Sequence, residues 1–153
     1  ILSFTAEEVW ESYGKKDSVF LNTFKDISKF RSEPLEKKYS VLFEIKKSIQ
    51  KALELARQSG SIGKSLEAKI FLETTGTSDL ENSFSETELE KLLIVSQVEF
   101  GKPSGEILSV VESDPFKISV VSPNESECPR CWRRTKDITI EGKLCNRCFD
   151  AMR

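Results

Sequence analysis

Residues 128–148 read CPRCWRRTKDITIEGKLCNRC, in which two Cys-x-x-Cys motifs are separated by thirteen residues. Two residues between paired cysteines let the backbone turn so that both sulfur atoms face one point. Two such turns facing each other supply four soft thiolates in a tetrahedron, which is the ligand set and geometry that Zn²⁺ prefers. The spacing therefore predicts one Zn²⁺ ion, held by Cys128, Cys131, Cys145 and Cys148.

Four protein ligands leave no open position on the metal, so the predicted zinc is structural rather than catalytic. The module has too little apolar material to fold alone, and metal binding is expected to supply most of its folding energy. Iron in the same thiolate geometry and disulfide pairing are the open alternatives. The chain contains no histidine, which removes the commonest general base and argues against acid–base chemistry within these residues.

The segment between the motifs predicts a short hairpin. Ile138–Ile140 and Lys143-Leu144 flank Glu141-Gly142, a pair suited to a tight turn. A hairpin that carries the second cysteine pair is the layout of a zinc ribbon.

An aromatic residue and several basic residues follow the first cysteine pair. Residues 128–153 contain seven basic and three acidic side chains, whereas the chain as a whole carries a net charge of -2. A ring beside guanidinium groups suits unpaired RNA, because the ring stacks on a base while the cations meet phosphates. The alternative is that Trp132 covers the metal site and the arginines are merely solvated. The candidate RNA-binding residues are Trp132, Arg133, Arg134, Lys136 and Arg147.

A long helix is predicted upstream, from Ser32-Glu33-Pro34 to a stop near Gly60. Its apolar side chains recur at steps of three and four, which indicates one buried stripe. These residues are Leu35, Tyr39, Leu42, Ile45, Ile49, Leu53 and Ala56.

Two shorter helices are predicted by a capping box accompanied by a hydrophobic staple. The first, FTAEEV at residues 4–9, has Thr5 and Glu8 as its box and should end near Gly14. The second, FSETEL at residues 84–89, has Ser85 and Glu88 and should run to about Leu93.

Four segments have the composition of strands, and turn residues separate them. With the helices they predict an α+β fold: a long helix with a small mixed sheet, followed by a C-terminal four-cysteine zinc ribbon. Residues 74–82 are polar and small and are expected to form a loop, and Ser122-Pro123-Asn124 is expected to be a linker. The predicted strands are 69–73, 94–100, 106–112 and 116–121.

The segment Gly60-Ser61-Ile62-Gly63-Lys64-Ser65 resembles a phosphate-binding P-loop but does not satisfy that motif. The motif requires four residues between its glycines, and here there are two. It also requires a strand before and a helix after, which is the reverse of the predicted order. The sequence therefore argues against nucleotide binding here.

The bulk composition, 38% hydrophobic and 31% charged, is typical of a globular protein. No apolar run approaches the ~20 residues needed to span a bilayer, and no leader resembles a signal peptide. We therefore expect a cytoplasmic protein with no membrane partner. Because the chain begins at Ile1 without a methionine, we expect it to be part of a longer protein.

Six segments resemble isoleucyl-tRNA synthetases of the bacterial type and occur in that family's order. The start of the chain is similar to the end of the family's helical anticodon-binding domain, and the cysteine motifs resemble its terminal zinc finger. The segments are ILSFTAEEVW at 1–10, ALELAR at 52–57, IGKSLEA at 62–68, LIVSQV at 93–98, and CPRCW at 128–132 with LCNRC at 144–148.

The resemblance implies three regions: the end of the anticodon-binding domain at 1–31, an α+β domain at 32–122 and the zinc-binding ribbon at 123–153. It also implies a role in holding the anticodon end of an isoleucine-specific tRNA, together with the remainder of the synthetase. The full-length class I enzyme attaches isoleucine to its tRNA using ATP. The class I signatures HIGH and KMSKS are absent, so the catalytic and editing sites are expected upstream.

Two other functions share parts of this pattern. A related zinc finger ends the formamidopyrimidine-type DNA glycosylases, but those enzymes need an N-terminal proline and a helical module before the finger. This chain starts with Ile1 and has a strand-rich segment there. A zinc-stabilised protein-interaction module is also compatible with the acidic body and the long helix.

Overall fold

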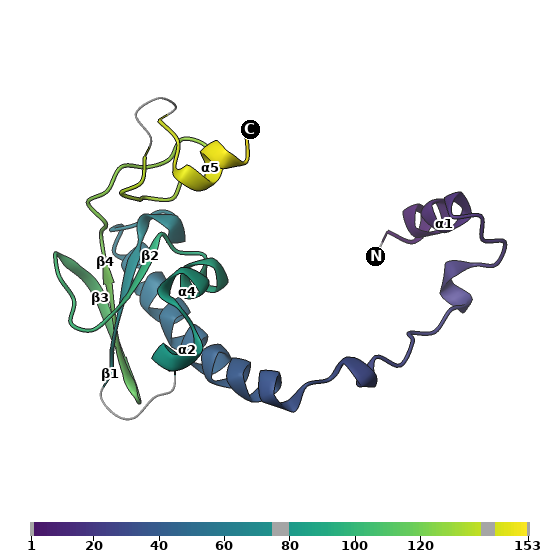
Figure 1. The fold of residues 1–153 in the computed structure, drawn as a ribbon, viewed down its shortest axis with the longest axis horizontal. Coiled ribbons are helices and arrows are strands. Elements are labelled where there is room, and N and C mark those ends of the chain that lie inside the picture. The colour runs from purple at the N-terminus through teal and green to yellow at the C-terminus, as the bar shows by residue number, and fades with distance from the viewer. Residues whose placement is uncertain (1, 75–79, 139–142, 153) are drawn as a thin grey trace. The chain divides into compact units, whose positions relative to one another are not determined.

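A long helix and a four-stranded sheet organise the larger part of the computed structural model (Figure 1). The structure describes residues 2–74, 80–138 and 143–152. The chain divides into two compact units, Ile1–Glu33 and Pro34–Arg153. Each unit is described by itself.

Helix α2 (Glu33–Gln58) begins and ends where the sequence predicts. Gly60 takes a positive φ of 74° just after the helix, a conformation that glycine adopts without steric cost. The predicted stripe is buried from its middle onward, whereas Leu35 at its start is 55% exposed. The buried residues of the helix are Leu42, Ile45, Ile49, Ala52, Leu53 and Ala56.

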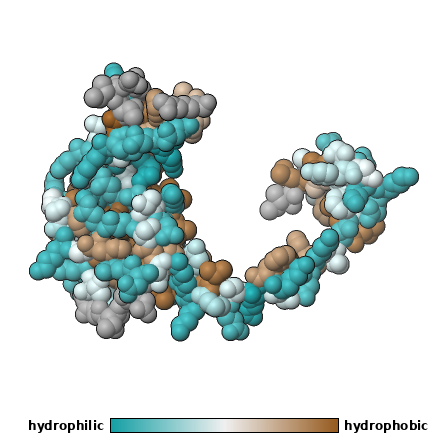
Figure 2. All heavy atoms as spheres, in the orientation of Figure 1, coloured by the Kyte–Doolittle hydropathy of each residue, from teal (hydrophilic) through white to brown (hydrophobic). Residues whose placement is uncertain are grey.

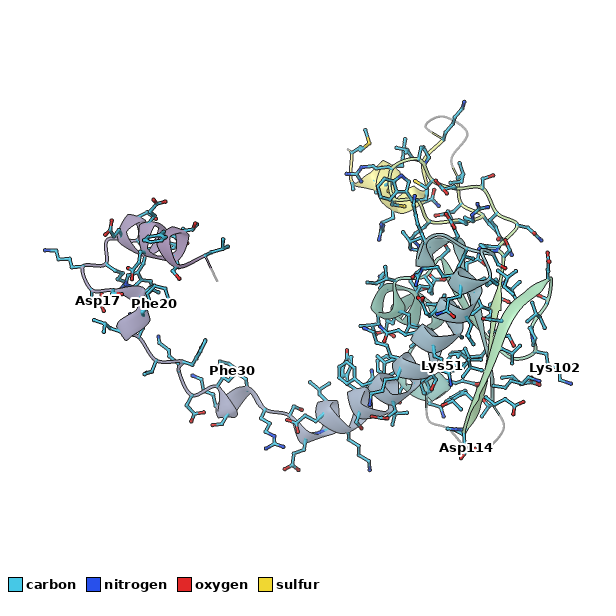
Figure 3. The ribbon with its side chains drawn as sticks, turned by 180° about the vertical axis from the view of Figure 1, so that it is seen from behind. Asp17, Phe20, Phe30, Lys51, Lys102 and Asp114 are labelled. Atoms are coloured by element: carbon cyan, nitrogen blue, oxygen red, sulfur yellow. The ribbon has the colours of Figure 1, made fainter. Side chains whose placement is uncertain are left out.

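The sheet is mixed, as predicted, with strand order β2-β1-β4-β3. Strand β1 runs parallel to β2 and antiparallel to β4, and β4 forms a hairpin with β3. Asp114 lies in the turn of that hairpin (Figure 3). The strands are β1 (Lys69–Thr74), β2 (Gln97–Phe100), β3 (Ile107–Ser113) and β4 (Phe116–Val121).

The sheet packs against α2 and α4 (Glu86–Leu93) through one apolar core. Ile70 and Leu72 of β1 and Ile118 and Val120 of β4 are all fully buried. Residues two apart on a strand share a face, so these four side chains form the core face of the sheet. The Ser109 hydroxyl of β3 also donates to a carbonyl of α2, that of Ala52, at 2.7 Å.

Helix α4 (Glu86–Leu93) confirms the second predicted capping box. The backbone N–H of Glu88 donates to the Ser85 hydroxyl, and the Ser85 N–H donates to the Glu88 carboxylate at 2.9 Å. Ile94 ends the helix in the left-handed conformation at φ 58°. The strand predicted from residue 94 therefore begins only at Gln97.

The predicted loop 74–82 is wrong at its end. Residues 80–82 belong to a short helix, α3 (Leu80–Ser83), because Leu80 is drawn into the core and is 1% exposed. Residues 75–79 of that predicted loop lie outside the described part of the chain.

The first unit contains α1 (Ser3–Ser12) and two 3-10 turns, η1 (Val19–Leu21) and η2 (Ser28–Phe30). The capping box predicted at Thr5 is wrong, because the helix starts two residues earlier and has Leu2 at its N-cap. Phe4 is 88% exposed, so the predicted staple does not form either. Apolar surface recurs along this unit (Figure 2), and its described helices bury no residue.

None of the helices in the described ranges is both long enough and apolar enough to cross a membrane, and this includes α2.

Candidate metal centre

The first cysteine pair sits in a tight backbone turn. The N–H of Trp132 donates to the carbonyl of Cys128 at 2.8 Å, and the N–H of Cys128 donates to the carbonyl of Arg133 at 2.9 Å. Trp132 has a φ of 61°, which is uncommon for a bulky residue. These contacts fold the chain back so that Cys131 faces the same point as Cys128.

The second pair opens a short helix, α5 (Asn146–Asp150), with Cys145 at its N-cap. The N–H groups of Cys148 and Phe149 both donate to the carbonyl of Cys145 at 2.9 Å. Cys145 also forms an antiparallel bridge with Ile138, as the predicted hairpin requires. The predicted turn, Glu141-Gly142, lies outside the described residues.

The four sulfur atoms lie within 4.8 Å of one another, and those of Cys131 and Cys145 are 3.7 Å apart. A zinc ion with Zn–S bonds of about 2.3 Å has tetrahedral S···S edges of about 3.8 Å. All four cysteines are free, and Cys128, Cys145 and Cys148 are buried. Sulfur type, spacing and burial therefore fit Zn²⁺, and the disulfide alternative does not hold in this structure.

The local environment shifts the pKa values of Cys128 and Cys145 in opposite directions. Burial disfavours the Cys128 thiolate, but N–H groups of Cys145, Cys131 and Arg130 donate to it and lower its pKa to about 6. Burial raises the pKa of Cys145 to about 12. Zinc binding requires the thiolate form of the cysteines, so the proton that burial favours on Cys145 is released as the metal binds.

Arg147 lies beside these sulfur atoms and is exposed. Slight desolvation of its guanidinium works against the charge, yet the negative sulfurs of Cys131 and Cys148 raise the pKa of Arg147. Four thiolates around one Zn²⁺ leave a net charge of -2, so a neighbouring cation offsets part of it.

Arg133 fastens the first cysteine turn to the α+β body. Its guanidinium pairs with Glu90 of α4 and donates to the carbonyl of Ser96 at 3.0 Å. The two charged side chains are 20% and 16% exposed. Arg133 is therefore bound to the body, and it can contact RNA only if these contacts break.

Ser96 is fully buried and joins three segments. Its hydroxyl donates to the carbonyl of Leu66 and accepts from the N–H of Arg134 at 2.7 Å, and its own N–H donates to the carbonyl of Ala68. The Gln97 side chain adds a bond to the carbonyl of Arg134 at 3.3 Å. The ribbon thus docks through backbone groups as well as through charge.

The remaining predicted RNA-binding residues differ in their surroundings. Lys136 is 81% exposed and lies 3.8 Å from a Glu125 carboxylate oxygen. Trp132 is 53% exposed, and the ammonium of Lys64 lies 4.8 Å from the centre of its ring. The Arg134 side chain is only partly exposed.

A hollow of about 350 Å³ lies between the ribbon and the body. It is open to the surface and lined by both signs of charge, with Glu90 and Glu99 from the body and Lys136, Asp137 and Arg147 from the ribbon. The structure thus brings Cys145 and three of the predicted cations, Arg133, Lys136 and Arg147, to one hollow. Sequence reasoning missed Lys64, Glu90 and Ser96 as partners of the ribbon, because no local pattern connects them to residues about forty or more positions away.

Two family models match the chain. Residues 1–72 match the anticodon-binding domain of tRNA ligase, and residues 126–151 match the zinc finger found in FPG and IleRS.

Curated relatives match almost from end to end. The isoleucine--tRNA ligase of Natranaerobius thermophilus is 32% identical over 97% of the chain, and that of Aquifex aeolicus is 35% identical over 99%. The ligase of Syntrophotalea carbinolica is 35% identical over 97%. The chain spans only about 17% of the length of these relatives.

An anticodon-binding region followed by this zinc finger defines a tRNA-ligase polypeptide. The pairing distinguishes the chain from a DNA glycosylase, with which it shares only the finger. The full-length similarity then identifies the family: the chain belongs to the isoleucine--tRNA ligases.

Proposed function

We propose that this chain is the C-terminal part of an isoleucine--tRNA ligase that holds the anticodon end of the isoleucine-specific tRNA. One observation carries the proposal: an anticodon-binding match and a zinc-finger match occur in one chain, in that order. The regions are the end of the helical anticodon-binding domain at 1–31, the α+β domain at 32–122 and the ribbon at 123–153.

One structural Zn²⁺ is held by Cys128, Cys131, Cys145 and Cys148, whose sulfur atoms have the required spacing. The metal stabilises the turn that presents the residues after Cys131. Trp132, Lys136 and Arg147 are exposed around it and supply a stacking surface and cations for unpaired RNA. Arg133 and Arg134 complete the basic set, with Arg133 acting chiefly through its hold on the body.

The complete enzyme is a class I ligase of the cytoplasm that uses ATP to attach isoleucine to its tRNA. Its adenylation and editing sites lie in other parts of the polypeptide, which are also the protein partners of this chain. These statements rest on the family and on the short share of its length that the chain spans.

The test is a binding measurement with an isoleucine tRNA transcript. The chain should bind it with strong salt dependence, because phosphate contacts release counterions. A footprint should show protection at the anticodon end that is lost when residues 123–153 are deleted. Metal analysis should find one zinc per chain. Equal affinity for duplex DNA and for tRNA would contradict the proposal.

A further inference from the structure

The segment that resembles a P-loop has two backbone donors engaged by a side chain of the same chain. The N–H groups of Gly63 and Lys64 donate to the Glu67 carboxylate at 2.7 and 3.2 Å. Ser65–Glu67 then forms a 3-10 turn that leads into β1. These two N–H groups are therefore not available to a phosphate, whereas the Lys64 side chain is exposed.

That side chain lies over Trp132, sixty-eight positions further along the chain. The Lys64 ammonium is 4.8 Å from the centre of the indole ring, and both residues are exposed. The approach is built into the fold, because Ser96 bonds both the carbonyl of Leu66 and the N–H of Arg134. These bonds hold the segment after Lys64 beside the segment after Trp132.

We propose that Lys64 and Trp132 together form a contact site for one unpaired nucleotide of the tRNA. The inference rests on the proposed function and adds a residue from the body to the ribbon's RNA surface. A cation over one face of the ring leaves the opposite face for a base to stack on. The ammonium neutralises the phosphate of the same or the neighbouring nucleotide.

Two observations favour an RNA contact over a simple surface pair. Trp132 keeps its large ring 53% exposed while its backbone is held at φ 61°, and uncommon backbone conformations of bulky residues concentrate at functional sites. The Glu67 carboxylate lies near both Lys64 and Arg134. Because one carboxylate is shared between two cations, these three side chains together carry a net positive charge, which favours a phosphate.

The experiment compares variants of the whole chain in their binding to an isoleucine tRNA transcript over a series of salt concentrations. Lys64→Ala should weaken binding several-fold and reduce the slope of log K against log salt by about 0.7–0.9, the value for one phosphate contact. Lys64→Arg should restore the slope. Trp132→Ala should weaken binding by about 5- to 150-fold without changing the slope, because stacking is not ionic.

Lys102→Ala is the matched control, since Lys102 is an exposed lysine in the turn between β2 and β3 (Figure 3) and is not part of the proposed site. A Trp10→Phe background isolates the fluorescence of Trp132, which tRNA should quench. Zinc content and circular dichroism must match the parent chain, which excludes misfolding of a variant.

The outcomes separate the two levels of the proposal. Failure of the unchanged chain to bind tRNA would count against the proposed function itself. If the chain binds but Lys64→Ala leaves both affinity and slope unchanged, the inference is overturned. A loss of affinity with an unchanged slope also overturns it, because Lys64 would then only orient the ring.

Discussion

Arg133 donates to the backbone carbonyl of Ser96 at 3.0 Å while it pairs with Glu90. This relationship fastens the metal module to the α+β body through a buried serine. The sequence alone predicts Arg133 as an RNA-binding residue, but in the structure its guanidinium contacts the body. If substitution of Arg133 weakens tRNA binding, the first explanation is therefore that the ribbon has shifted relative to the body, and the loss of a phosphate contact comes second.

Arg133→Ala should lower the free energy of unfolding of the ribbon by about 1–3 kcal/mol, because it leaves Glu90 and the Ser96 carbonyl without a charged donor. Hydrogen exchange should quicken at the amides of Cys128 and Arg134. Lys47→Ala is the control, since the Lys47–Glu44 pair is 71% and 74% exposed and should matter by less than about 1 kcal/mol. Equal effects of the two variants would contradict the role given to Arg133.

Removal of zinc should unfold the ribbon and leave the body intact. Metal binding is the main source of folding energy for a small module with four cysteine ligands, whereas the sheet and α2 share an apolar core of their own. In NMR spectra, a chelator should collapse the signals of residues 126–138 and 143–151 while those of Ile70 and Val120 persist. Cys145→Ser should reproduce the effect without a chelator. A ribbon spectrum unchanged after metal loss would refute the structural role of the ion.

The capping box of α4 should be measurable by substitution. Ser85→Ala removes the acceptor for the Glu88 N–H and should cost about 1 kcal/mol in urea unfolding. Thr5→Ala is the matched control, because Thr5 has the same sequence pattern but lies inside α1. Its effect should stay within about 0.5 kcal/mol. A larger cost at Thr5 than at Ser85 would reverse the structural assignment.

Glu67 should titrate at lower pH than an ordinary glutamate. The N–H groups of Gly63 and Lys64 donate to its carboxylate and lower its pKa from the ordinary 4.5. Because the folded-state pKa is the lower one, the stabilisation is present above pH 4.5 and is lost as the pH falls through the folded value. NMR titration of the Glu67 carboxyl carbon should give a midpoint below 4.5, and Glu67→Gln should remove this pH-dependent contribution. A midpoint at or above the ordinary value would show that the turn does not hold in solution.

Local patterns in the sequence determined the elements whose causes are local. The Cys-x-x-Cys spacing, the α2 stripe and the Ser85 box each depend on residues a few positions apart, and the structure confirms the four-cysteine cluster, the helix and the cap. The same kind of pattern gave a wrong prediction at Thr5. Its spacing forms a capping box only where a helix begins, and α1 begins at Ser3.

Tertiary structure alone decided how the metal module is joined to the body and which side chains surround it. Ser96 bonds to Leu66 and Arg134, thirty and thirty-eight positions away. Lys64 meets Trp132 across sixty-eight positions. Such pairs depend on how the sheet and the ribbon close on each other, and no periodicity or spacing encodes that closure. The spacing of the four cysteines was therefore enough to predict a metal site. The side chains that surround this site could be identified only from the folded structure.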